Sequence, residues 1–486
     1  MIKSLGRRWV SVSSWVYGNS DELEITASVF LSQKPPPATT LVVNGSVGSG
    51  KSFALDQAMN YIGKNKLLDP DIVFSLGLKN LLAVENVTSM AFIDTINRGV
   101  GSVIAGFEKK GLDRSVKVNF REQLDTKARK LFFLRKTLDD MIAEENPEVK
   151  SGYKEETQKI VRIINEKIKN YPKVVKLNTF DYDGLKHIID RLPLADAFEV
   201  LGLSYLVSGV EEEFGELTSA LQVATLQHFG QICQEDNHAY PVLRIDDTEL
   251  FYQDPSLMSY FKNLVKNLST SHSFYSILEG SGNFSEVLRL MLQNPERFQI
   301  FCVKDYPVES VESLLNSMGI EMTPEEFKQI YSLIGGSSAL VFNAANALSP
   351  GGMSAAQFIK QLKSNVLREV NQKLASTKTE NQDEKTWQEK FMGIDQLKLR
   401  ASLYIMSNLM NQPLEIEPQE FSENYMMQQL CLMKLLYYDG KHLDFDKPVI
   451  KDILPYTQFW NITKGYLNNY KNSFAYNKIL SINDEI

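Results

Sequence analysis

The sequence predicts an α/β fold in which helices flank a mostly parallel sheet and further helical parts are attached. Short apolar runs typical of buried parallel strands occur at residues 41–44, 72–78, 239–251, 273–283 and 297–303. Segments with helical periodicity lie between these runs, and strands that alternate with helices form parallel sheets covered by helices. The 486 residues exceed what one compact core holds, so two or three domains are expected.

The composition is that of a globular protein and gives no general attraction to polyanions. Hydrophobic residues make up 43% of the chain and charged residues 23%, which argues against disorder. The net charge of −8 does not favour nucleic acid or anionic membrane. No apolar run reaches the roughly 18 residues of a membrane span. Cys233, Cys302 and Cys431 are far apart, which predicts no disulfide framework or zinc site and favours a reducing, intracellular compartment.

Residues 1–38 form an N-terminal segment that precedes the first apolar run. Its first twenty residues contain Lys3, Arg7, Arg8 and several serines but no acid, which is the composition of an organelle transit peptide. This targeting arm would direct the chain to mitochondria, and without it the cytoplasm or nucleus is expected. The alternative interpretation is a first strand or arm of the folded protein.

A glycine-rich motif follows residues 41–44 and leads into an amphipathic helix. It matches G-x-x-x-x-G-K-[ST] at each fixed position and consists of Gly45, Ser46, Val47, Gly48, Ser49, Gly50, Lys51 and Ser52. Its glycines let backbone N–H groups turn inward around a phosphate, and the helix start adds a positive dipole end. Lys51 is expected to reach the β- and γ-phosphates, and the Ser52 hydroxyl to bind Mg²⁺. The sequence therefore predicts a site for a nucleoside triphosphate.

An acidic pair ends the apolar run at residues 242–245. A phosphate-loop enzyme needs a carboxylate at the end of a neighbouring strand to hold Mg²⁺, and Asp246 is the candidate. Asp247 is the candidate base for the attacking water, and Glu249 is a second candidate. Many ATPases have a glutamate at the position of Asp247, so the shorter side chain puts efficient hydrolysis in question. The alternative is an ordinary acidic strand end.

Three polar residues lie near the ends of the next two apolar runs. Ser281 and Asn283 are candidates for orienting water beside the γ-phosphate, and an ordinary turn is the alternative. Arg297 is a candidate arginine finger toward a nucleotide in the same subunit or, in a homo-oligomer, in a neighbouring one; the alternative is a surface arginine. The sequence contains no convincing N-K-x-D element, so ATP with Mg²⁺ is the expected ligand rather than GTP.

A charged helical segment at residues 107–176 interrupts the α/β pattern. It contains 18 Lys/Arg and 12 Asp/Glu, an excess of +6. We expect a helical hairpin here, preceded by a helix at 90–111 with a break near Gly99 and Gly101. The hairpin is interpreted either as a solvated, salt-bridged pair of helices or as a nucleic-acid-binding patch.

The pattern from residue 306 onward is mainly helical. Three short helices between residues 309 and 348 predict a helical unit over 306–374, and a polar stretch at 375–385 predicts a linker. Residues 386–486 then form a C-terminal domain, with helices expected at 387–411 and 423–437. A β-hairpin is predicted at 435–450, with Asp439 and Gly440 as its turn.

The order of these motifs resembles the STAND class of AAA+-related ATPases, especially the archaeal-type, Crinkler and retrotransposon-hot-spot ATPases. The resemblance covers about residues 38–450 and depends on the phosphate-binding motif, PVLRIDDTEL, SILEGSGN, RFQIFCV and the terminal hairpin. It implies an AAA+-like P-loop NTPase domain at 39–305, a helical lid at 306–374 and a winged-helix-like domain at 386–486. Ser338 replaces the usual proline after Gly335-Gly336, and the insertion at 107–176 is outside the common pattern.

The resemblance also implies roles for residues and a function. Asp246 would be the magnesium aspartate, Asp247 would occupy the catalytic glutamate position, and Ser281 or Asn283 would be the sensor. Proteins of this class use ATP to switch their contact with a macromolecular partner. Two alternatives are a nucleotide-bound structural protein of a mitochondrial assembly, such as the small ribosomal subunit, and a nucleic-acid-acting ATPase.

Overall fold

The computed structural model describes most of the chain between residues 15 and 457. The described residues are 15–34, 36–37, 39–65, 73–77, 89–145, 158, 161–206, 211–236, 240–248, 251, 255–268, 273–280, 297–349, 351–375, 405–406, 408–410, 412–424, 427, 430–431, 435–439 and 441–457. No helix among them is long and apolar enough to cross a membrane.

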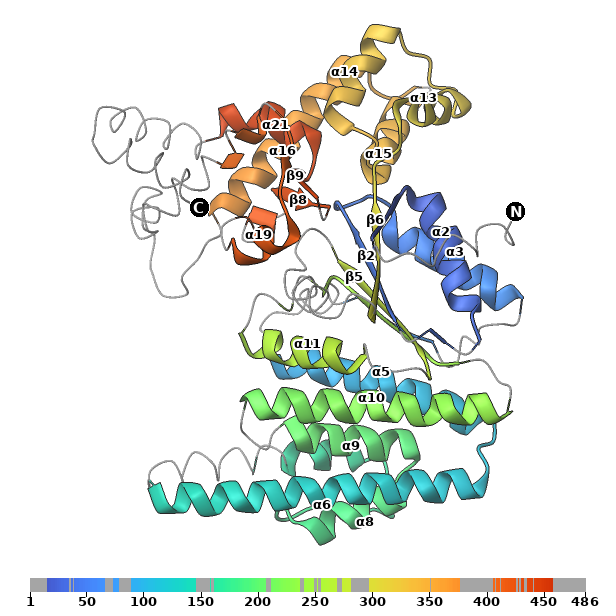
Figure 1. Cartoon of the computed structure of the whole chain (residues 1–486), viewed down its shortest axis with the longest axis vertical. Helices are drawn as coiled ribbons and strands as arrows, with labels where there is room; N and C mark the ends of the chain where they lie inside the picture. The colour runs from blue at the N-terminus through green and yellow to red at the C-terminus, as the bar shows by residue number, and fades with distance from the viewer. Residues whose placement is uncertain are drawn as a thin grey trace.

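A six-stranded parallel sheet forms the centre of the molecule (Figure 1). Its strands are β1 (Trp15–Gly18), β2 (Thr40–Gly45), β3 (Val73–Gly77), β4 (Val242–Asp246), β5 (Tyr275–Gly280) and β6 (Phe298–Val303). The five apolar runs are therefore strands of one parallel sheet, as predicted. The order β1-β6-β2-β5-β4-β3 places β2 between β5 and β6 and separates it from β4 by one strand. The carboxyl ends of β2, β5 and β4 consequently meet at one edge of the sheet.

The N-terminal segment contributes both a strand and a helix to this domain. β1 pairs with β6 in parallel, and α2 (Ser20–Ser32) begins at a capping box formed by Asn19 and Glu22. α2 packs against α3 (Lys51–Lys64), the helix that follows the glycine-rich motif (Figure 1). Residues 15–32 are therefore built into the sheet domain rather than forming a separate arm. Residues 1–14 lie outside the described residues.

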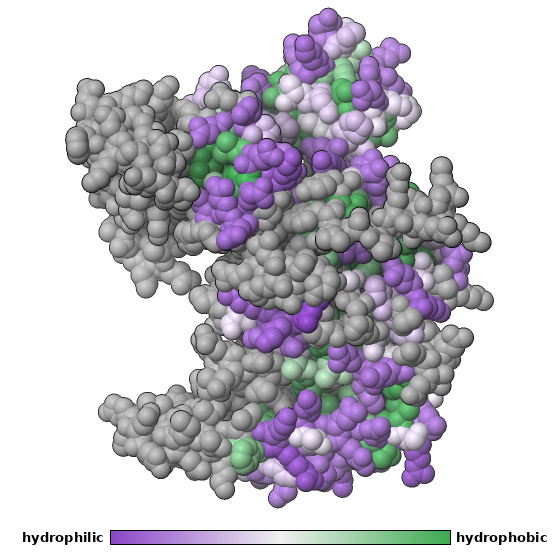
Figure 2. All heavy atoms as spheres, in the orientation of Figure 1, coloured by the Kyte–Doolittle hydropathy of each residue, from purple (hydrophilic) through white to green (hydrophobic). Residues whose placement is uncertain are grey.

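Six helices among the described residues form most of a layer beside the sheet, here called the helical layer. They are α5 (Ser89–Lys109), α6 (Arg114–Glu145), α8 (Tyr182–Arg191), α9 (Leu194–Leu206), α10 (Glu211–Asp236) and α11 (Pro255–Leu268). They stack below the sheet in the view of Figure 1, and α5 reaches the sheet at β3. Figure 2 shows a mostly hydrophilic described surface over the lower part of this layer.

α5 is one continuous helix, so the break expected near Gly99 and Gly101 is wrong. A Cβ atom at Gly99 would lie 1.8 Å from the ring of Phe74 on β3. A Cβ atom at Gly101 would lie 2.6 Å from the carboxylate of Glu199 on α9. These glycines therefore allow neighbouring elements to approach closely and do not bend the helix.

α6 is the first arm of the helical hairpin expected at residues 107–176, and of the second arm residues 161–168 are helical. Asp125 on α6 forms ion pairs with Arg129 at 3.0 Å and with Lys186 on α8 at 3.3 Å. Tyr182 also donates to Asp125 at 2.5 Å. These contacts fit the interpretation of a solvated, salt-bridged helical segment.

Four helices after β6 form a smaller unit, here called the α13–α16 unit. They are α13 (Val308–Ser317), α14 (Pro324–Ile334), α15 (Ser338–Leu348) and α16 (Ala355–Ala375). The first three are the short helices predicted from the sequence. They bury an apolar cluster of their own, separate from the main core, which includes Val311, Leu315 and Ile330.

A three-stranded antiparallel sheet with short helices, here called the hairpin unit, ends the described chain. It contains β7 (Leu414–Glu415), α19 (Pro418–Glu423), β8 (Leu436–Tyr438), β9 (His442–Phe445) and α21 (Pro448–Ile453). β8 and β9 confirm the predicted hairpin. The turn lies one residue later than predicted, because Asp439 N donates to His442 O at 3.1 Å. Helices were also expected at 387–411 and 423–437, but most of these residues lie outside the described part of the chain.

Candidate nucleotide-binding site

The glycine-rich motif at residues 45–52, here called the phosphate loop, connects β2 to α3. Gly48 and Gly50 have φ angles of +83° and +91°, a region that residues with side chains rarely adopt. At Gly45, a Cβ atom would lie 2.6 Å from the Ser49 hydroxyl oxygen. The motif thus has glycine where the loop conformation requires it, which explains the spacing found in the sequence.

Lys51 and Ser49 give the phosphate loop the chemistry of an anion site. Lys51 Nζ donates to the carbonyl oxygens of Gly45 at 2.8 Å and Ser46 at 2.9 Å, which holds the ammonium group over the loop. The Ser49 hydroxyl is buried and has no hydrogen-bond partner within the described part of the chain. A buried hydroxyl and an inward cation at a helix start fit a bound phosphate group.

Oxygen atoms suited to Mg²⁺ converge beside the start of α3. The Ser52 hydroxyl donates to Asp246 Oδ2 at 3.2 Å and also to the carboxylate of Glu279. Within the described ranges, no group of three or more His, Cys, Asp or Glu side chains is placed to hold a metal ion. Mg²⁺ at nucleotide sites is held by one or two carboxylates together with substrate phosphates, so this oxygen set fits Mg²⁺.

The pKa of Asp246 is raised by its surroundings. Burial, together with the nearby carboxylates of Glu279 and Asp247, raises its pKa to about 7. A divalent cation at this position would favour the ionised carboxylate, because it reverses the local charge.

Asp247 follows Asp246 in an uncommon backbone conformation. Its φ angle is +57°, the one positive value among the described residues other than glycine. Its backbone N–H donates to Asp246 Oδ1 at 2.6 Å. Such conformations cost free energy and cluster at functional sites. Glu249, Ser281 and Asn283, the other predicted residues here, lie outside the described residues.

Arg297 lies far from the phosphate loop of its own chain. It directly precedes β6, whose residues Phe298 and Val303 pair with Thr40 and Gly45 of β2. Six residues of extended chain, about 20 Å, therefore separate Arg297 from the edge that carries the loop. The prediction of an arginine finger within the same subunit is wrong for this reason. A role toward a neighbouring subunit stays a prediction.

Two residues that the sequence analysis did not single out complete this edge of the sheet. Glu279 is fully buried near the end of β5, and Arg244 on β4 donates to its Oε2 atom from Nη2 at 2.8 Å and from Nε at 3.2 Å. Arg244 also pairs with Asp56 on α3 at 2.5 Å. The sequence did contain a signal for this pair, because Arg244 and Glu279 are charged residues within otherwise apolar strand runs. Buried charges are rare unless they are paired.

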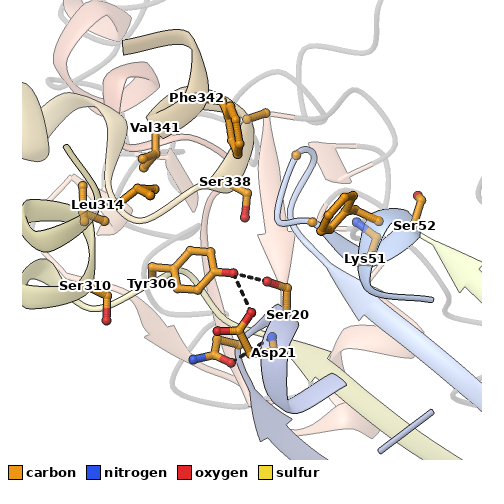
Figure 3. Close-up of a pocket in the computed structure, with 16 residues that line it drawn as sticks. Ser20, Asp21, Lys51, Ser52, Tyr306, Ser310, Leu314, Ser338, Val341 and Phe342 are labelled. Carbon is orange, nitrogen blue, oxygen red and sulfur yellow. Dashed lines mark hydrogen bonds between the residues drawn. The ribbon is translucent and has the colours of Figure 1, made fainter. Parts of the chain in front are cut away.

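A pocket of about 720 Å³ opens beside the phosphate loop (Figure 3). Its walls come from the first turn of α2, the loop and the start of α3, and helices α13 and α15. Tyr306, within the pocket, contacts the Ser20 hydroxyl and donates to Asp21 Oδ1 at 3.2 Å. Phe53 and Phe342 also line the pocket and are 66% and 57% exposed. The pocket has the volume and the aromatic lining of a small-molecule site.

The start of α15 lies directly on the phosphate loop. Ala339 N donates to Gly48 O at 2.9 Å, and the Ser338 hydroxyl donates to Ser49 O at 3.2 Å. The approach is close, because a Cβ atom at Gly48 would lie 2.7 Å from that of Ala339.

The hairpin unit touches the same loop from another side. Asp446, directly after β9, accepts a hydrogen bond from Val47 N at 3.1 Å. Asp305, which follows β6, lies close to Asp446 and accepts a hydrogen bond from the Ser46 side chain. Burial and the neighbouring Asp446 raise the pKa of Asp305 to about 6. Two acidic side chains thus meet beside the loop.

Comparison with known proteins finds similarity among solved structures only. No family model matches the chain, and no curated protein matches it. Among solved structures, the chain is similar to a Walker-type ATPase of Pyrococcus abyssi, with 13% identity and a TM-score of 0.41 over 90% of this chain and 95% of that one.

Proposed function

We propose that the chain binds ATP with Mg²⁺ at residues 45–52 and hydrolyses it to switch its contact with a macromolecular partner. The observation that carries this proposal is the phosphate loop with its inward Lys51, which opens onto a pocket of nucleoside size. The phosphates would lie against the loop N–H groups and the Lys51 ammonium group. The base and ribose would enter the pocket between α2, α13 and α15.

The residues at the edge of the sheet would have separate roles in hydrolysis. Ser52 and Asp246 would hold Mg²⁺, which supplies charge stabilisation for the transferred phosphoryl group. Asp247 would orient the attacking water and accept its proton. Its uncommon backbone conformation supports this role, because stored strain is a feature of functional positions.

The switch is proposed from the contacts that the loop makes with two peripheral units. α15 donates to the carbonyl oxygens of Gly48 and Ser49, and the hairpin unit accepts the N–H of Val47. A change in the bound phosphates would alter these contacts, since they share the backbone that cradles the phosphates. In this proposal the α13–α16 unit is a lid, and residues 386–486 form a winged-helix-like domain that carries the signal.

ATP binding is tested by isothermal titration calorimetry of the full-length chain and the Lys51→Ala variant. Removing a hydrogen-bonded charge is expected to weaken binding by roughly 10–100-fold. Lys64→Ala is the matched control, because Lys64 is an exposed lysine at the other end of α3. Equal affinity in wild type and Lys51→Ala, or no binding by either, would contradict the proposal.

Hydrolysis and partner separate this proposal from its two alternatives. Phosphate release that is lost in Asp247→Asn, with binding retained, supports an ATP-hydrolysing switch. ATP bound without turnover, together with co-purification with a mitochondrial ribosome, would favour the structural protein. Affinity for DNA or RNA that falls steeply with salt would favour the nucleic-acid-acting ATPase.

A further inference from the structure

Glu279 lies in the sheet between the two elements that carry the expected Mg²⁺ residues. β5 separates β2 from β4, and Glu279 pairs with Val43 two residues before the phosphate loop. On the other side Leu278 pairs with Ile245, so Glu279 is level with Asp246. The side chain of Glu279 is fully buried.

The two carboxylate oxygens of Glu279 have different partners. Arg244 donates twice to Oε2, from Nη2 and from Nε, while Ser52 donates to Oε1. Arginine frequently bonds both oxygens of a carboxylate in a fork. Here one oxygen is held by arginine, and the other is directed at the hydroxyl that is expected to bind Mg²⁺.

The charges around Ser52 leave an excess of acid. Arg244 is shared by Glu279 and Asp56, at 2.8 Å and 2.5 Å, and Asp246 lies on the other side of the Ser52 hydroxyl. The buried Glu279 and the part-buried Asp246 therefore share one guanidinium group, which also pairs with the exposed Asp56. Burying carboxylates is costly unless they are paired or bind a cation, so this arrangement favours a divalent cation beside Ser52.

We propose that Glu279 is a further member of the Mg²⁺ site with Ser52 and Asp246, and that Arg244 positions it by holding Oε2. The inference rests on the proposed function, because the cation arrives with the nucleotide. Oε1 would accept hydrogen bonds from water molecules bound to the cation, because Mg²⁺ keeps several waters at such sites. Arg244 is a positioning residue in this arrangement.

The experiment measures the affinity of full-length protein for ATP with Mg²⁺ and with EDTA, under conditions without turnover. Wild type is expected to bind more tightly with Mg²⁺, and this gain is the readout. Glu279→Gln is expected to reduce the gain by roughly 10–100-fold and to leave the affinity in EDTA within about threefold. Asp56→Asn is the control, because it removes the exposed partner of Arg244 and should keep the gain.

The outcomes separate the inference from the function it rests on. If Glu279→Gln lowers the melting temperature but keeps the wild-type gain, Glu279 is only the partner of Arg244 and the inference is wrong. Wild type that binds no ATP in either condition contradicts the proposed function itself. Should Glu279→Gln fail to fold, the Arg244→Met/Glu279→Gln double variant removes both buried charges, and the same loss of the Mg²⁺ gain is expected.

Discussion

The helical layer and the hairpin unit are attached to the same sheet in different ways. The helical layer meets the sheet at β3, which β4 and β5 separate from β2, and its helices pack largely on one another. The hairpin unit lies at the end of β2 itself. There Asn44 donates to Tyr438 O at 2.9 Å, Cys302 Sγ contacts Asp439 O at 2.8 Å and Asp446 accepts from Val47. Under the proposed function, the hairpin unit would therefore respond to phosphates at the loop, and the helical layer would stabilise the fold.

Two glycines with similar φ angles, one in the phosphate loop and one between α5 and α6, compare the loop with the helical layer. Gly48 and Gly111 have φ angles of +83° and +86°, so alanine costs about 1–2 kcal/mol of strain at either. At Gly48 the new Cβ would also lie 2.7 Å from Ala339, whereas at Gly111 nothing lies within 4 Å. We expect Gly48→Ala to weaken ATP binding more than tenfold and Gly111→Ala to leave it unchanged, measured by calorimetry. A similar loss in both variants would remove the distinction.

Asp446 tests whether the hairpin unit and the nucleotide share the loop. Asp446→Ala removes an acceptor from Val47 N and a negative charge beside the phosphates. We expect ATP affinity to rise several-fold, about 1 kcal/mol, and limited proteolysis of the hairpin unit to become faster. Asp452→Ala is the control, since Asp452 is in the same unit and its half-exposed pair is with Lys363 on α16 rather than with the phosphate loop. If Asp446→Ala changed neither the ATP affinity nor the rate of proteolysis, the contact between Asp446 and Val47 would not couple the hairpin unit to the nucleotide.

The acidic pair beside the loop predicts a dependence of stability on pH. The pKa of Asp305 is raised to about 6 in the folded protein, so the folded state binds this proton more tightly than the unfolded chain. Its contribution is fully present below the ordinary aspartate pKa and is lost as pH rises toward 6, by up to about 3 kcal/mol. Melting temperatures between pH 4 and pH 7 should therefore fall less steeply for Asp305→Asn than for wild type. Asp113→Asn, at an exposed aspartate, should keep the wild-type slope.

The core of the helical layer should affect folding without affecting the loop. Phe229 is fully buried, stacks on Phe107 with centroids 4.9 Å apart and meets Phe120 edge-on. Phe229→Ala is expected to lower the free energy of unfolding by about 3–5 kcal/mol, measured by urea denaturation. The ATP affinity of the folded protein should stay within twofold of wild type. A large change in affinity would mean that the layer is coupled to the phosphate loop after all.

The sequence was most informative where one local pattern dictates structure. The apolar runs predicted the sheet, because strands buried on both faces need apolar side chains throughout. The phosphate loop was predicted because Gly48 and Gly50 occupy conformations closed to other residues. The hairpin at residues 435–450 followed from its turn residues, although its closing pair shifted the turn by one position.

Features that depend on distant residues could not be predicted in the same way. The pairing of Arg244 with Glu279 joins strands that lie 35 residues apart in the chain, so neither residue indicates the other. Arg297 was assigned to the site from its strand, but the direction of β6 places it at the opposite edge. α2 was missed although Asn19 and Glu22 form a capping box, a local signal that was present.

The position of β2 in the sheet has a consequence for how the chain reaches this state. Both neighbours of β2 are distant in sequence: Thr40 pairs with Ser276 of β5 and with Phe298 of β6. During synthesis the phosphate loop would leave the ribosome long before either neighbour exists. Closing so large a span carries an entropic cost and gives the sheet a high contact order, which slows folding. A nascent chain that ends before residue 298 would expose an incomplete sheet. We therefore expect the incomplete chain to bind chaperones during synthesis.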